Sequence, residues 1–168
     1  MHEAQRQQAA DLLKARGIDR ALFAFNQSVT WLTGFAPPVQ TGPNLFSGGP
    51  ALVWYEAGHF TLIVQDVYAD LAAPFAQEAD GTLLTYASNT VDRPITSVAN
   101  LAAVLWSLVQ GAGGSVGVEL DWLTARLLHT VTDAVPQAHI VPADGWLNPL
   151  RMIKTPEELA RLRQNFAL

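Results

Sequence analysis

The chain has 168 residues, 49% hydrophobic and 15% charged, which suits one globular domain with a sizeable core and excludes a disordered chain. Its net charge of −5, without a basic run, argues against a nucleic-acid partner, and the absence of cysteine excludes disulfides and thiolate metal sites. No apolar stretch is long enough to span a membrane, and the polar N-terminus is unlike a signal peptide, so we expect a cytoplasmic protein.

Helical and strand patterns alternate along the first half of the chain. The apolar spacing predicts a helix over 3–16, strands over 21–25 and 29–32, and a long irregular loop over 36–49. These are followed by a hairpin with a Gly-containing turn over 51–64, a helix over 67–78 that Pro74 should kink or shift, and a strand over 82–86.

The second half continues the alternation. It contains a predicted helix over 96–109, a strand over 116–120, a helix over 122–134 capped by Asp121, and a short strand over 139–141. Helices that alternate with strands indicate an α/β fold, and the hairpin makes the sheet mixed. We therefore expect a central mixed sheet of about five to six strands, flanked by helices.

The last segment carries a strong helix start. Thr155 is placed to cap the helix, Pro156 suits its first position, and Glu158 completes a capping box. Leu159, Leu162 and Phe166 then form one apolar stripe. Two interpretations stay open: the helix docks on its own domain, or it is the beginning of a longer structure. Turn-forming residues over 144–154 mark the candidate boundary.

Motifs for catalysis are weak. Residues 113–117 match the G-x-S-x-G nucleophile pattern around Ser115, but here a helix precedes the serine and a strand follows it, which inverts the required order. His129 and Asp133 share a helix face, yet two ligands are too few for a metal site. Glu119 lies in an apolar strand and needs a partner, whether structural or functional. The residues therefore predict no catalytic or metal-binding position.

Three segments resemble the family of creatinase, prolidase and aminopeptidase P. Residues 28–35 (Ser-Val-Thr-Trp-Leu-Thr-Gly-Phe) are similar to its N-x-x-Y-L-T-G-F segment, with Trp31 in place of the usual tyrosine. Residues 116–119 (Val-Gly-Val-Glu) resemble its I-G-V-E strand, and 150–159 resemble the L-R-x-I-K-S-x-x-E-I segment that opens its interdomain helix. The resemblance covers essentially the whole chain, and the last segment is its most specific part.

The resemblance implies a two-domain parent. The N-terminal domain of this family has a ribonuclease-H-like sheet, which would correspond to residues 1–150, and residues 151–168 would begin the interdomain linker helix. The catalytic pita-bread domain, which in the peptidases binds a pair of divalent metal ions (Mn, Co or Zn), would lie outside this chain. The implied partners are the parent's own C-terminal catalytic domain, a second copy in a homodimer, and a peptide substrate. No nucleic-acid or membrane partner is implied.

The resemblance also suggests roles for particular residues. In dimeric members the N-terminal domain assists assembly and restricts the active-site entrance, and we expect Trp31, Phe35 and Phe46 to shape such an entrance. The linker positions are Arg151, Lys154, Glu158, Leu159 and Leu162.

Three functional hypotheses remain. The first is a non-catalytic domain of an Xaa-Pro dipeptidase or aminopeptidase, or of a creatinase-like amidinohydrolase. The second is a stand-alone binding or assembly module. The third, a small hydrolase that uses Ser115, is disfavoured by the inverted motif.

Overall fold

A mixed six-stranded sheet lies at the centre of the molecule. The computed structural model describes residues 2–37 and 48–166, and within them the strand order is β4-β3-β2-β1-β5-β6. Strand β1 pairs antiparallel with β2, as β2 does with β3, whereas the β1–β5, β3–β4 and β5–β6 pairs are parallel. The predicted fold class is therefore confirmed. The strands are β1 Arg20–Phe23, β2 Leu52–Glu56, β3 His59–Gln65, β4 Gly81–Tyr86, β5 Ser115–Val118 and β6 His139–Pro142.

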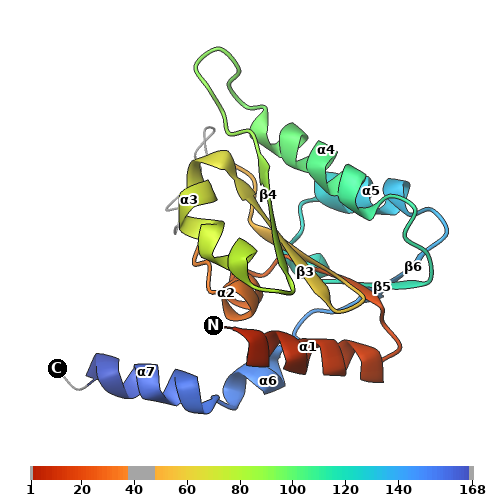
Figure 1. Cartoon of the computed structure of the whole chain (residues 1–168). Coiled ribbons are helices and arrows are strands. Elements are labelled where there is room, and N and C mark those ends of the chain that lie inside the picture. Colours follow the sequence, from red (N-terminus) through yellow and green to blue (C-terminus); the bar gives the residue numbers. More distant parts are fainter. Residues whose placement is uncertain (1, 38–47, 167–168) are drawn as a thin grey trace.

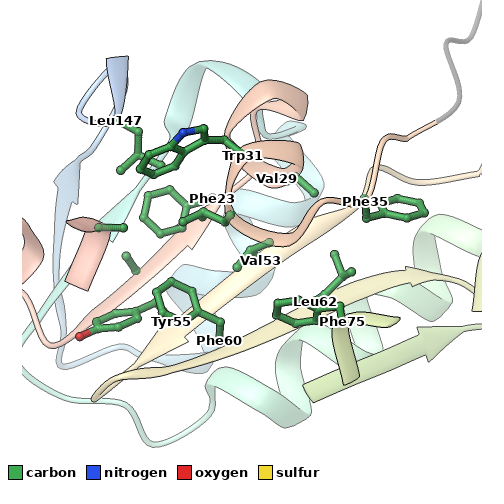
Figure 2. Close-up of a cluster of buried hydrophobic side chains, with 14 of the residues drawn as sticks. Phe23, Val29, Trp31, Phe35, Val53, Tyr55, Phe60, Leu62, Phe75 and Leu147 are labelled. Atoms are coloured by element: carbon green, nitrogen blue, oxygen red, sulfur yellow. The ribbon is translucent and has the colours of Figure 1, made fainter. Parts of the chain in front are cut away.

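Helices cover both faces of the sheet, as Figure 1 shows. The helices α1, α2 and α6 lie on one face and α4 and α5 on the other. Alternate residues of the central strands divide between the two cores: Phe23 and Val53 pack with the first group of helices, and Leu22 and Trp54 with the second. Figure 2 shows the first core. The helices are α1 Glu3–Ala15, α2 Asn26–Thr33, α4 Ser97–Val109, α5 Ala125–Ala134 and α6 Asn148–Met152.

Most predicted elements are confirmed to within a few residues at their ends. This holds for the helices over 3–16 and 96–109, for the 51–64 hairpin, and for the strands over 82–86, 116–120 and 139–141. The hairpin turn uses two residues in the left-handed region, Ala57 (φ 49°) and Gly58 (φ 93°). Periodicity is a reliable guide for these elements because each buries one clear apolar face or run.

The predicted strand over 29–32 is wrong, because these residues lie inside helix α2. Their β-branched and aromatic side chains have strand propensity, but tertiary contacts override it. The helix ends at Gly34, whose φ of 75° closes the cap, with its N–H donating to the carbonyl of Thr30. A Cβ at Gly34 would also come within 2.8 Å of the His2 ring, which would have to move aside.

Two other helix predictions need correction at their boundaries. The segment 67–78 forms three short pieces, η1 Asp66–Tyr68, α3 Ala69–Ala72 and η2 Ala73–Gln77, with Pro74 in the first turn of the last piece. Helix α5 begins at Ala125 and is capped by Thr124, whose Oγ1 accepts the Leu127 N–H at 3.4 Å.

Asp121 was the expected cap of this helix, and it lies instead in the turn η3 Leu120–Trp122. The Asp144 carboxylate accepts the backbone N–H groups of Leu120 and Asp121 at 3.1 and 3.0 Å. These two bonds fix the turn and delay the start of the helix.

The C-terminal helix α7 Pro156–Phe166 leaves the body of the domain and points away from the sheet (Figure 1). The predicted capping box is confirmed: the Thr155 N–H donates to Glu158 Oε2 at 2.7 Å, and the Glu158 N–H donates to Thr155 Oγ1 at 3.2 Å. Among the residues that the structure describes, no helix has the length and apolar character needed to cross a bilayer.

Candidate functional site

Helix α2 is positioned by a buried carboxylate from the end of strand β5. Glu119 is 1% exposed and accepts the backbone N–H groups of Ala24 and Phe25 at 2.8 Å each and the Ser28 hydroxyl at 2.7 Å. Burial raises the pKa of Glu119, although these hydrogen bonds oppose the shift. The partner that the sequence required for Glu119 is thus the N-terminal turn of α2, and the role seen is structural.

A hollow with a volume of about 850 Å³ lies between α2, residues 36–37 and the C-terminal helices α6 and α7. Gln27 and Thr30 line it from α2, and Arg151 from α6. Glu158 and Leu162 complete it from α7. This groove is our candidate functional site, because its walls contain both Trp31, which we expect at the active-site entrance, and the predicted linker residues Arg151, Lys154, Glu158 and Leu162.

Arg151 carries the main polar contacts across the groove. Its Nη2 donates to Gln27 Oε1 at 2.6 Å and its Nη1 to Asn148 Oδ1 at 3.2 Å. The guanidinium carbon also lies 5.4 Å from the centre of the Phe25 ring, which stacks on Trp122 with ring centres 4.1 Å apart. Sequence reasoning could not predict the contacts of Arg151 with Gln27 and Phe25, because these residues lie more than a hundred positions away along the chain.

The other predicted linker residues make local contacts. The Lys154 ammonium donates to the Arg151 carbonyl, and Glu158 belongs to the capping box. Leu159 and Leu162 are each 40% exposed, and Phe166 is 83% exposed. The apolar stripe of α7 is therefore partly exposed, most of all at Phe166.

Of the three predicted entrance residues, Trp31 and Phe35 lie in the described part of the chain. Trp31 and Phe35 belong to the first core and are only 8% and 4% exposed. Figure 2 shows both side chains among the labelled residues of this core. The Trp31 indole N–H is buried and has no hydrogen-bond partner among the described residues, although the side chain contributes to the groove wall. Phe46 lies outside the described residues. The entrance role of all three stays a prediction.

A second polar cluster, which sequence reasoning missed, lies at the first turns of α1. Arg6 is 1% exposed and donates to both carboxylate oxygens of Asp80 at 2.7 Å and to the Leu32 carbonyl at 3.2 Å. Burial opposes ionisation of Asp80, but the bonds and charge of Arg6 lower its pKa. One feature of the sequence could have indicated that Arg6 is buried: it lies on the same helix face as the apolar residues Ala9 and Leu13.

Neither the metal-binding nor the serine-hydrolase pattern is assembled in the described part. Across residues 2–37 and 48–166, no group of three or more His, Cys, Asp or Glu side chains is arranged to hold a metal ion. The implied metal pair therefore has no fitting residues there and stays a prediction for another domain. Ser115 is the first residue of β5 and follows helix α4, so its surroundings are unlike a strand-to-helix nucleophile turn.

Solved structures with the same fold come from peptidases. The Xaa-Pro dipeptidase from Bacillus anthracis superposes with a TM-score of 0.64 at 20% identity over 98% of this chain. The X-Pro aminopeptidase from Thermotoga maritima gives 0.63 at 18% identity over 95%. This chain spans 39% of the length of each of those two proteins. The N-terminal domain of the cytoplasmic peptidase PepQ from Mycobacterium tuberculosis gives 0.61 at 20% identity, covering 88% of this chain and 98% of that domain.

At such identities the superpositions establish the fold. A search of curated proteins finds no match to this sequence. The model of the creatinase/prolidase N-terminal domain, however, matches residues 5–153, which is most of the chain. The chain therefore belongs to the creatinase/prolidase N-terminal domain family.

Proposed function

We propose that this chain is the non-catalytic N-terminal domain of a metallohydrolase that resembles Xaa-Pro dipeptidases and aminopeptidases. The observation that carries the proposal is the family match over residues 5–153, together with structural neighbours from the same class of peptidase. Two of these neighbours are much longer than this chain, which corresponds to 39% of each. The parent would hydrolyse the peptide bond before proline with a metal-bound hydroxide supplied by its other domain.

Within that parent, the domain would assist assembly of a homodimer and limit the width of the active-site entrance. The apolar stripe of Leu159, Leu162 and Phe166 on α7, with exposures of 40%, 40% and 83%, and the groove beside α2 support an assembly role, since contiguous exposed apolar patches often mark interaction surfaces. A cytoplasmic location is also proposed, supported by the neighbour described as a cytoplasmic peptidase.

Two alternatives remain. A creatinase-like parent would act on a different C–N bond, and an N-terminal domain of this fold serves either chemistry, because the reaction is set elsewhere. A stand-alone assembly module would use the same α7 surface for a separate partner.

The size of the native polypeptide separates a two-domain parent from the stand-alone module. We would raise an antibody against these 168 residues and probe an immunoblot of the source cells. A band far above 18.2 kDa would support the two-domain parent, whereas a band at 18.2 kDa would contradict it and favour the stand-alone module.

If the parent is longer, the purified native protein should be assayed with Mn²⁺, Co²⁺ or Zn²⁺ on Xaa-Pro dipeptides and on creatine in parallel. Hydrolysis of the dipeptides that is abolished by a chelator would support the peptidase assignment. Activity on creatine alone would overturn it in favour of the amidinohydrolase.

A further inference from the structure

Core packing of the C-terminal segment ends just before Arg151. Leu147 is 1% exposed and belongs to the first core, and Leu150 packs against that core. The next two apolar side chains, Met152 and Ile153, are 80% and 77% exposed. Apolar burial therefore fixes the chain up to Leu150, and it does not fix the residues that directly follow Arg151.

The guanidinium of Arg151 spans this change with contacts in two directions. Backwards along its own helix it bonds Asn148 at 3.2 Å, and across the groove it bonds Gln27 on α2 at 2.6 Å. It also lies against the Phe25 ring, at 5.4 Å from the ring centre. A planar group with several fixed donors can satisfy such a set together, whereas a single ammonium cannot.

The elements that receive these contacts are themselves fixed. The Phe25 N–H is bonded to the buried Glu119 carboxylate, and its ring stacks on Trp122 at 4.1 Å between centres. On the other side of Arg151, α7 begins as a closed unit at Thr155 through its capping box with Glu158. Only residues 152–154 lie between the two fixed parts.

We infer that Arg151 is a positioning residue that fixes the direction in which α7 leaves the domain, by holding Gln27 and Phe25 immediately before the short joint at 152–154. The Lys154 ammonium, bonded to the Arg151 carbonyl, restricts the joint further. As a result, the apolar stripe of α7 is presented in one orientation rather than over a wide range. This inference concerns the 168-residue chain itself and does not depend on the proposed function.

The chain is well suited to a direct distance measurement, because it contains no native cysteine. We would introduce Ala160→Cys on α7 and Asp133→Cys on α5, both at exposed positions, attach spin labels, and measure the distance distribution by double electron–electron resonance. The otherwise unchanged chain should give one narrow peak. Arg151→Met should lose that peak and give a broad distribution, while the thermal midpoint and the far-UV circular dichroism stay unchanged.

Two further variants make the result specific. Arg93→Met removes an exposed arginine from a distant loop and should leave the narrow peak intact. Arg151→Lys keeps the charge but should broaden the distribution, since the ammonium cannot bond Gln27 and Asn148 while covering Phe25. A broad distribution in the unchanged chain, or a narrow one in Arg151→Met or Arg151→Lys, would overturn the inference.

Discussion

Helices α2 and α7 are held in opposite ways. The first turn of α2 depends on Glu119, a carboxylate from a distant strand, whereas α7 begins with a capping box formed by its own residues. Helix α2 is packed into the core, and α7 leaves its apolar stripe partly exposed. The comparison teaches that a local cap is enough to start a helix, while a helix built from residues with strand propensity needs support from elsewhere in the fold. Four predictions test this difference.

The largest effect should follow removal of the support for α2. Glu119→Leu leaves the N–H groups of Ala24 and Phe25 and the Ser28 hydroxyl without their acceptor, and should lower the free energy of unfolding by about 3 kcal/mol or more. Urea denaturation measures the change. Glu119→Gln keeps one acceptor oxygen and should lose less, so equal losses in the two variants would contradict this account.

A smaller loss should follow removal of the buried arginine of α1. Arg6→Met breaks the two 2.7 Å bonds to Asp80, and because Asp80 is 30% exposed the expected loss of stability is about 2 kcal/mol. The matched control is Arg20→Met, since the Arg20–Glu56 pair has exposures of 28% and 44% and should contribute less than about 1 kcal/mol. Similar urea midpoints for the two variants would show that burial of Arg6 adds nothing.

The contribution of Glu119 to the free energy of unfolding should decrease as the pH rises. Its pKa is raised in the folded state by burial, with the Asp144 charge adding to the shift, so its contribution is fully present below the unfolded value and falls as pH rises through the folded value. The stability advantage of the unchanged protein over Glu119→Gln should therefore be greatest near pH 4 and shrink toward pH 7. Parallel urea titrations across this range measure it, and an advantage that grows with pH would contradict the assignment.

The smallest effect should come from α7. Deleting residues 155–168 should change the free energy of unfolding by less than about 1 kcal/mol, because Leu159 and Leu162 are each 40% exposed and Phe166 is 83% exposed. A thermal melt of the shortened chain tests this. A loss of several kcal/mol would mean that α7 docks on the domain in solution, which is the alternative that the sequence left open.

The contrast between α2 and α7 also explains how far the sequence could lead. The sheet, its hairpin and the helices over 3–16 and 96–109 follow from periodicity, and the start of α7 follows from three neighbouring residues. The helical state of 29–32 could not be predicted, because the acceptor that stabilises it lies about 90 positions away at Glu119. The same applies to the contacts of Arg151 with Gln27 and of Arg6 with Asp80, which only the folded chain brings together.

The distance between β1 and β5 along the chain has a consequence for synthesis. Leu22 of β1 pairs with Val118 of β5, so the parallel partner of β1 is synthesised only after most of the polypeptide has been made. Glu119 follows directly, which means that the nascent segment carrying Val29 and Trp31 leaves the ribosome long before the carboxylate that makes it helical. During that interval the antiparallel unit of β1, β2 and β3 can already form, and only the edge of β1 that later pairs with β5 stays open, which is the kind of edge that invites aggregation.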